Sequence, residues 1–557
     1  MKHSPRALVA QLRHQPVALL IVGLLLAGIA HGLWEILGLA WAHWLQPNLF
    51  GDSFAFVARG SAPELLSWLT TQHNEHRIVW AKAASLVETE LLQVPPGQSA
   101  LFQNLALILG CAGLWCWLCQ RLLRRTDLCL ITTLAGWLLL LNPWQYENLS
   151  WEFQTPWFLI NALVLLGALL LSIPTAGRWP QSLAAVGLPW IALTSTGQGL
   201  ALAVVFAACA LLHSRRLGFL VTASTALAGL TFFVLLPYSK PAGHPELSFQ
   251  LDYFLRAWLG GPWQGLAVLA VVISAVLLGR RQPIAKSNWP ALLMPGLFSV
   301  LFAGMITLSR AGFGVEQANS SRYISHSVML GLSALLALAL ADDHSQRRTT
   351  PLLGGFLVLL TTLGSFPQGL QPGGLSYAGA WAEGQRRSEE YRQRFICQAQ
   401  QAALAARQIR LLEPCKEIFP DQTMVTEYFQ GNLQVQPLGW HQQLIRNAMG
   451  AAGGPIRHQV DQQNLTAASL QLQGWAFLAN DPNQPLYLLG DYGTHEQVGW
   501  PVDLPRRDVK RTHHIKNRNV GFDTSLPRTL EGQPLRAVLL AGPKQSVQIW
   551  EDPSADG

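Results

Sequence analysis

The sequence is short of charged residues. Only 13% of its 557 residues are Asp, Glu, Lys or Arg, whereas an ordinary globular protein carries roughly 25%. Hydrophobic residues make up 50% of the chain, and the mean hydropathy is +0.23. This shortage argues against an ordinary soluble enzyme and makes a membrane protein the first class to test.

The sequence also lacks a single basic patch and a zinc-protease motif. The formal charge is +7, but the basic residues lie in short clusters between apolar segments, so no single basic patch indicates nucleic acid as a partner. The HExxH pattern of zinc proteases is also absent. The basic clusters instead resemble the signals that orient membrane helices.

Long apolar runs are present, and nearly all of them precede residue 367. An apolar stretch of about 17–25 residues can cross a bilayer core of about 30 Å. Such runs predict about eleven transmembrane helices. They lie at 17–39, 100–120, 128–142, 156–173, 182–195, 198–213, 217–236, 264–279, 291–308, 324–341 and 351–366. The first follows a basic N-terminus, but its length favours a retained helix over a signal peptide. The 182–213 region also fits a single re-entrant pair.

Lys and Arg in the connecting segments predict the orientation. With the N-terminus inside, 14 of these residues lie on the cytoplasmic side and seven on the other side before residue 367. Cytoplasmic loops are enriched in Lys and Arg. An odd helix number then places the C-terminal part outside. We therefore expect a multi-pass protein of a bacterial inner (plasma) membrane, with a cytoplasmic N-terminus and membrane lipid around it.

The long first outer segment, 42–98, contains two candidate sites. Asp52, beside a glycine, is placed to act as a general base or to ligate a divalent metal. The alternative is a solvated loop acid or a helix N-cap. His73, Glu75, His76 and Arg77 follow. On a helix, His73 and Arg77 would share one face and could bind a phosphate or diphosphate. The alternative is an interfacial amphipathic helix.

Two later outer segments add acids and cations. Glu147 and Glu152 flank Trp151 in the segment 142–155, an arrangement that suits the binding of sugar hydroxyls. Trp144, Trp151 and Trp157 are expected in the interfacial aromatic belt. In 309–323, Arg310 and Arg322 suit a lipid-linked phosphate, or they simply extend to the membrane interface.

These features together resemble the GT-C superfamily of polyprenyl-phosphate-sugar-dependent glycosyltransferases, in its uncharacterised bacterial form. The similar elements are the acid after the first helix, Asn-Glu-His-Arg at 74–77, Glu-Asn-x-x-Trp-x-Phe-Gln at 147–154, and Ser-Arg-Tyr ending at Tyr323. The resemblance in architecture covers 17–367.

The resemblance implies an inverting sugar transfer at the outer membrane face to a glycan, lipid or protein acceptor. It assigns the acceptor-activating base to Asp52 and the donor phosphate to Arg310, Arg322 or Arg77. Many members have paired acids where Ser53 follows Asp52 here, so a divalent metal is left open.

The chain beyond 367 changes character. Residues 368–454 read as a polar helical segment, and 455–557 as about seven short strands of a small β-sandwich. The fold expected is thus a helical membrane domain, 1–367, followed by an outer α+β region. Cys397 and Cys415 fall in that region, where a disulfide between them or two free thiols are equally expected.

Other functions remain open. A transporter or flippase for lipid-linked glycans predicts internal repeats and mid-membrane charges, but we find no repeat, and His31 and Glu35 are nearly alone within apolar runs. A third alternative is an O-antigen-ligase-type or acyl-transfer enzyme; acyl transfer would need a His or Ser deep in the membrane, for which His326 is the candidate. A non-catalytic assembly role is the last alternative.

Overall fold

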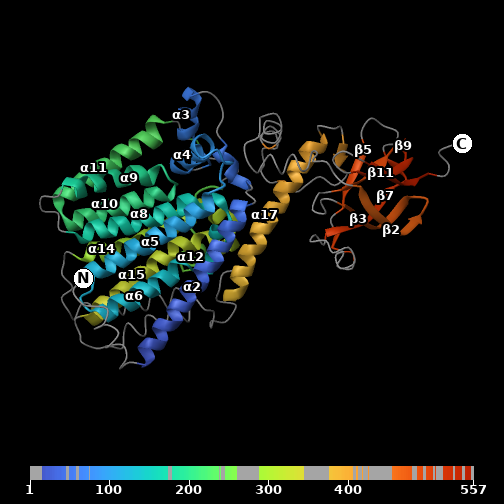
Figure 1. Ribbon diagram of the computed structural model, residues 1–557. Helices are drawn as coiled ribbons and strands as arrows, with labels where there is room; N and C mark the ends of the chain where they lie inside the picture. Colours follow the sequence, from blue (N-terminus) through green and yellow to red (C-terminus); the bar gives the residue numbers. More distant parts are fainter. Residues whose placement is uncertain are drawn as a thin grey trace. The chain divides into compact units, whose positions relative to one another are not determined.

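A computed structural model describes most of the chain as helix and the C-terminal part as sheet (Figure 1). The described residues are 16–45, 49–57, 62–74, 76–173, 179–236, 245–259, 288–343, 376–405, 409–411, 455–479, most of 486–552, and a few isolated positions. They form two compact units. Unit 1 comprises 1–45, 55–91 and 96–389, and unit 2 comprises 46–54, 92–95 and 390–557.

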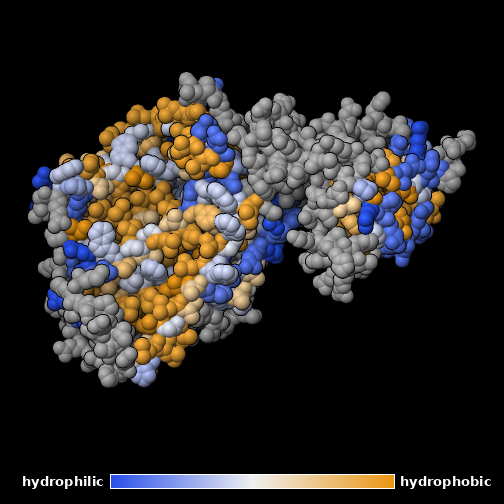
Figure 2. All heavy atoms as spheres, in the orientation of Figure 1, coloured by the Kyte–Doolittle hydropathy of each residue, from blue (hydrophilic) through white to orange (hydrophobic). Residues whose placement is uncertain are grey.

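Unit 1 is a helical bundle whose long helices lie side by side (Figure 1). Its main helices are α2 (Pro16–Leu45), α5 (Ala100–Leu122), α6 (Thr126–Leu140), α8 (Thr155–Ser172), α9 (Trp179–Leu193), α10 (Gln198–His213), α11 (Arg215–Leu230), α14 (Trp289–Arg310) and α15 (Ile324–Asp343). One continuous hydrophobic core joins them. Hydrophobic side chains also cover much of the exposed face in Figure 2, as expected of helices that meet an apolar solvent.

Seven helical stretches among the described residues are long and apolar enough to cross a membrane. They coincide with seven of the predicted spans, beginning at 17, 100, 128, 156, 217, 291 and 324. The predicted spans 182–195 and 198–213 form α9 and α10, which are shorter, at 15 and 16 residues. The remaining predictions, 264–279 and 351–366, lie outside the described residues.

A tight turn joins α9 to α10. Gly199 in the first turn of α10 faces the backbone of α9, and a Cβ atom there would lie 1.9 Å from the Ala192 carbonyl oxygen. Only glycine permits this approach. The 182–213 region is therefore a pair of closely packed short helices.

The segment 142–155 is a buried chain of short helices rather than a solvated loop. It consists of η3 (Pro143–Gln145), α7 (Tyr146–Ser150) and η4 (Glu152–Gln154), after which α8 begins. The prediction that Trp144, Trp151 and Trp157 belong to an interfacial belt is wrong, because they are only 4%, 8% and 6% exposed. Trp157 instead stacks on His326, with 4.9 Å between ring centroids.

The first outer segment folds into η1 (Gly51–Phe56), α3 (Ala62–Thr70), α4 (Val79–Leu86) and the π-helical turn η2 (Val87–Leu91). The helix expected at 73–77 is not formed. His73 and His76 exchange two backbone hydrogen bonds of 2.8 Å across a tight turn. Asn74 occupies the left-handed region there, with φ of 50°, which asparagine tolerates better than most residues. His73 and Arg77 therefore share no helical face.

The segment 309–323 also forms short helices: η7 (Ala311–Phe313), η8 (Val315–Asn319) and η9 (Ser321–Tyr323). Gly314, with φ of 100°, separates η7 from η8. The helix α12 (Leu251–Leu259) packs against η8 and α14.

The long helix α17 (Tyr377–Ala405) begins in unit 1 and ends in unit 2. Its first part lies on α2, where the Gln385 amide donates to Glu35 at 2.8 Å and the Tyr377 hydroxyl lies 3.4 Å from Nδ1 of His31. His31 and Glu35 also form a pair at 3.7 Å. The two polar residues noted within the first apolar run are therefore partners of α17.

The described part of unit 2 contains three sheets, of which the two larger share a common core and the third is the two-stranded pair β8-β9. The five-stranded sheet has the order β1-β5-β4-β10-β11 and the four-stranded sheet has the order β2-β3-β7-β6. The strands are β1 (Ile409–Leu411), β2 (Ile456–Leu465), β3 (Ser469–Leu478), β4 (Tyr487–Asp491), β5 (Gln497–Pro501), β6 (Leu504–Pro505), β7 (Asn519–Pro527), β8 (Thr529–Leu530), β9 (Gln533–Pro534), β10 (Ala537–Ala541) and β11 (Ser546–Glu551). One hydrophobic cluster includes Leu472 of β3 and Leu488 of β4, so the sheets face each other.

Unit 2 departs from the sequence prediction before residue 455. Within the segment 368–454, which the sequence predicts to be helical, α17 ends at Ala405 and is followed by the strand β1, which pairs in parallel with β5. Most of the rest of this segment, 412–454, lies outside the described residues. Cys397 is disulfide-bonded. Its predicted partner Cys415 lies outside the described residues, so the pairing stays a prediction.

Candidate functional site

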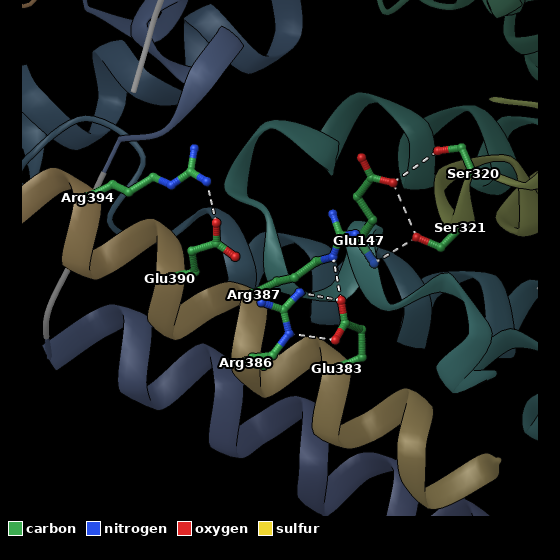
Figure 3. A network of polar contacts seen from close by, with 8 residues as sticks. All are labelled: Glu147, Ser320, Ser321, Glu383, Arg386, Arg387, Glu390 and Arg394. Carbon is green, nitrogen blue, oxygen red and sulfur yellow. Dashed lines mark hydrogen bonds and ion pairs between the residues drawn. The ribbon is translucent and has the colours of Figure 1, made fainter. Parts of the chain in front are cut away.

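Glu147 and Arg322 meet at the end of the bundle where α8 and α15 begin. Oε2 of Glu147 accepts hydrogen bonds from the hydroxyls of Ser320 and Ser321 at 3.0 and 3.2 Å (Figure 3). Nε of Arg322 lies 3.6 Å from the other carboxylate oxygen. Asn148 completes the contact by donating from its amide to the Arg322 carbonyl at 2.9 Å. Two predicted segments therefore form one polar cluster.

Aromatic residues and a second arginine border this cluster. The Arg322 guanidinium lies over the Tyr323 ring at 5.9 Å, and Tyr323 stacks on Trp157. Tyr253 on α12 is buried, and its hydroxyl donates to Gln317 at 3.3 Å. Burial and then Tyr323 raise the pKa of Tyr253, while Arg310 and Arg322 act in the opposite direction. Both predicted arginines thus act electrostatically on one phenol.

The first half of α17 adds cations beside Glu147. Arg387 lies over the ring of Tyr146, the residue before Glu147, at 5.3 Å. Arg386 and Arg387 both bind Glu383, at 2.6 and 3.0 Å (Figure 3). The hydrogen bond from Arg386 is the main reason that the pKa of Glu383 falls to about 2. Sequence reasoning missed these residues because α17 was assigned to a separate outer segment.

The histidines of the first outer segment contact other parts of unit 1. The His73 ring lies 5.4 Å from Phe153, next to Glu152, and Phe153 stacks on Phe56. Nδ1 of His76 accepts a hydrogen bond of 2.9 Å from the backbone of Gly197 in the α9–α10 turn. Glu152 is fully buried, at 0% exposure. His73 therefore adjoins the segment that carries both predicted acids, whereas Glu75 lies outside the described residues.

Arg77 and Lys82 hold the end of α3. The Arg77 guanidinium donates to the carbonyls of Thr70 and Phe232, and the Lys82 amine donates to those of Trp68 and Thr71 at 2.6 and 3.1 Å. Cationic side chains at a helix C-terminus satisfy its unpaired carbonyls. These contacts give Arg77 a structural role, which competes with its predicted role in phosphate binding.

Burial shifts the pKa of Lys82 and of Glu88 in opposite directions. Burial, with a smaller effect of Arg77, lowers the pKa of Lys82 to about 8. Burial raises the pKa of Glu88, although hydrogen bonds from Ser99 and Gly97 oppose the rise. Glu88 accepts from both backbone amides at 2.6 Å. It therefore ties η2 to the start of α5.

Asp52 belongs to unit 2, while the cluster around Glu147 belongs to unit 1. Within unit 2 its segment is held by Phe50, which stacks on Tyr391 of α17 at 4.0 Å and lies beside Arg394. The Ser53 amide donates to the Phe50 carbonyl at 3.2 Å, so Asp52 lies in a tight turn.

His326 is enclosed in the bundle core. Its ring contacts Trp157, Phe298 and Phe302, and its Nδ1 lies 2.7 Å from Oδ1 of Asn161. This contact satisfies Nδ1 alone, because Nε2 has no hydrogen-bond partner among the described residues. Among the described residues, no group of three His, Cys, Asp or Glu side chains is arranged to hold a metal ion.

Comparisons with known proteins give no relative. No family model, curated protein or solved structure matches the chain.

Proposed function

We propose that the protein is a multi-pass glycosyltransferase of a bacterial inner membrane that uses a polyprenyl-phosphate sugar as donor. The supporting observation is the contact of Glu147 with Ser320, Ser321 and Arg322, which gathers acids, arginines and aromatic rings at one end of an apolar helical bundle. A lipid donor requires such a site beside apolar helices. With a cytoplasmic N-terminus and the predicted helix number, this end and the C-terminal sheets lie outside.

The proposed chemistry divides between cations and an acid. The acceptor hydroxyl loses its proton to a carboxylate, its oxygen attacks the anomeric carbon, and the bond between that carbon and the phosphate oxygen breaks. The electron pair stays on the lipid phosphate, where Arg322 and Arg310 would stabilise the added charge. Glu147 would hold the Arg322 guanidinium in position. Asp52 is the proposed base by the family resemblance.

The test is an assay of the purified protein in lipid nanodiscs with polyprenyl phosphates that carry glucose, mannose, galactose or arabinose. We expect transfer with at least one donor, and at least a hundredfold loss for Asp52→Asn and for Arg322→Lys. Arg256→Lys is the matched control, because Arg256 pairs with the exposed Glu316 at the same 3.6 Å. No transfer with any donor, or full activity of Asp52→Asn, would disprove the mechanism.

A further inference from the structure

Several buried oxygen atoms in and beside the 142–155 segment have no hydrogen-bond partner among the described residues. They are Asn104 Oδ1, Gln145 Oε1, Asn148 Oδ1, Ser150 Oγ and Gln154 Oε1. We call these five atoms the acceptor set; their residues are at most 3% exposed. Because buried polar groups are nearly always hydrogen-bonded, this concentration points to something that binds there.

The orientation of two amides in the acceptor set is fixed by their neighbours. The Gln145 amide nitrogen donates to the Leu140 carbonyl at 2.7 Å, and that of Asn148 donates to the Arg322 carbonyl at 2.9 Å. A backbone carbonyl can only accept, so the nitrogen must occupy that side and the oxygen must face the other side. The remaining capacity of both side chains is therefore purely that of an acceptor.

The oriented amide oxygens of Gln145 and Asn148 can only accept, whereas Ser150 Oγ can also donate, and Trp144 Nε1, a donor in the same segment, likewise has no partner among the described residues. Phosphate oxygens at neutral pH are themselves acceptors, so they cannot satisfy the two amide oxygens, whereas O–H groups can. The acceptor set adjoins the cationic part of the cluster, because Asn148 binds the backbone of Arg322. The two surfaces differ in chemistry: arginines on one side and amide oxygens on the other.

We infer that the acceptor set is a binding site for hydroxyl groups, adjacent to but chemically distinct from the arginine site. Two sources offer these groups, the sugar of a lipid-linked donor and ordered water. A cavity of about 10 Å³, lined by Gln145, Asn161 and Ser325 among others, is close to the volume that one water needs. The sugar source rests on the proposed function, and the water source does not.

The test compares Gln145→Met and Asn148→Leu with the parent in nanodiscs. Native mass spectrometry would measure affinity for a polyprenyl phosphate and for the same lipid phosphate carrying glucose, mannose, galactose or arabinose. The control is Gln181→Met. Gln181 is also buried with an unpartnered Oε1 among the described residues, but it binds the Leu170 and Ile173 carbonyls at the opposite end of α8.

If sugar hydroxyls bind, both variants lose at least tenfold in affinity for the glycosylated lipid and keep their affinity for the bare lipid phosphate, and the control changes neither. If water binds, affinities stay unchanged and a high-resolution map of the parent shows density within hydrogen-bond distance of these oxygens. Equal loss of both lipids, or unchanged affinities without such density, would overturn the inference. If the parent protein binds neither lipid, the proposed function is refuted. The presence or absence of water density at these oxygens then still decides whether the acceptor set binds hydroxyl groups.

Discussion

The ion pair between Glu147 and Arg322 is supported by partners on both sides. Glu147 also accepts from two serine hydroxyls, and Nε of Arg322 also donates to Ser320 at 3.0 Å. A carboxylate that is mostly buried and bound in this way holds its neighbours in one arrangement, and its removal leaves their polar groups unpaired. The pair therefore sets the geometry of the cluster.

The substitution Glu147→Gln tests this role. We expect the free energy of unfolding to fall by about 2 kcal/mol, because a charge-assisted contact in a mostly buried site is lost. Glu316→Gln removes a carboxylate at the same 3.6 Å from Arg256, but its side chain is 83% exposed, so we expect a loss below about 1 kcal/mol. Denaturation in matched detergent measures both, and equal losses would refute the structural role of Glu147.

Lys82 predicts a pH dependence of stability. Its pKa in the folded protein, about 8, lies below the ordinary value of 10.5. Between these values the unfolded chain binds more protons, so the stability contributed by Lys82 rises with pH from about 8 to 10.5 and is lower below that window. The stability difference between the parent and Lys82→Gln should change by at most about 3 kcal/mol across the window. A difference that is constant with pH would contradict this assignment.

At the scale of elements, the α9–α10 turn depends on one glycine. An added Cβ at Gly199 would lie 1.9 Å from the Ala192 carbonyl oxygen, whereas one at Gly187, within α9, meets nothing within 4 Å. We expect Gly199→Ala to destabilise the protein by about 2 kcal/mol or more through forced backbone displacement. Gly187→Ala should stabilise it by up to about 1 kcal/mol through helix propensity. Thermal unfolding of both variants measures the two effects, and similar unfolding midpoints for the two variants would refute the packing argument.

The burial of the segment 142–155 could not be predicted from its local sequence. Its acids, amides and tryptophans resemble a solvated connection when only neighbouring residues are considered. In the folded protein, α5, α8, η9 and α15 pack around it, and its polar groups bind residues distant in the sequence. Burial of this kind depends on helix packing, which no short window of sequence contains.

At the scale of the whole molecule, the helix number determines which side each part occupies. Glu316→Cys in η8 and Asn464→Cys in β2 should react with a membrane-impermeant maleimide added to intact spheroplasts. Arg215→Cys, at the start of α11, should react only after the membrane is permeabilised. All three positions are well outside the hydrophobic cores of their units.

Two other patterns would contradict the topology in different ways. Labelling of Glu316→Cys with protection of Asn464→Cys would show that the number of spans after residue 316 is wrong by one. Labelling of Arg215→Cys alone would show that the orientation is reversed. The parent protein, whose free cysteines among the described residues all lie in or beside apolar helices, supplies the background.

The sequence by itself determined where the apolar helices lie, because the cost of placing a residue in a bilayer depends on a local window of side chains. It also separated the strand-forming C-terminal region through composition and turn residues. The tertiary structure alone decided which polar residues meet. Glu147 and Ser321 are 174 positions apart, Gln385 and Glu35 are 350 apart, and the left-handed turn at Asn74 replaced an expected helix. Such contacts arise from the packing of complete helices, so a local pattern can nominate Glu147 and Arg322 but cannot pair them.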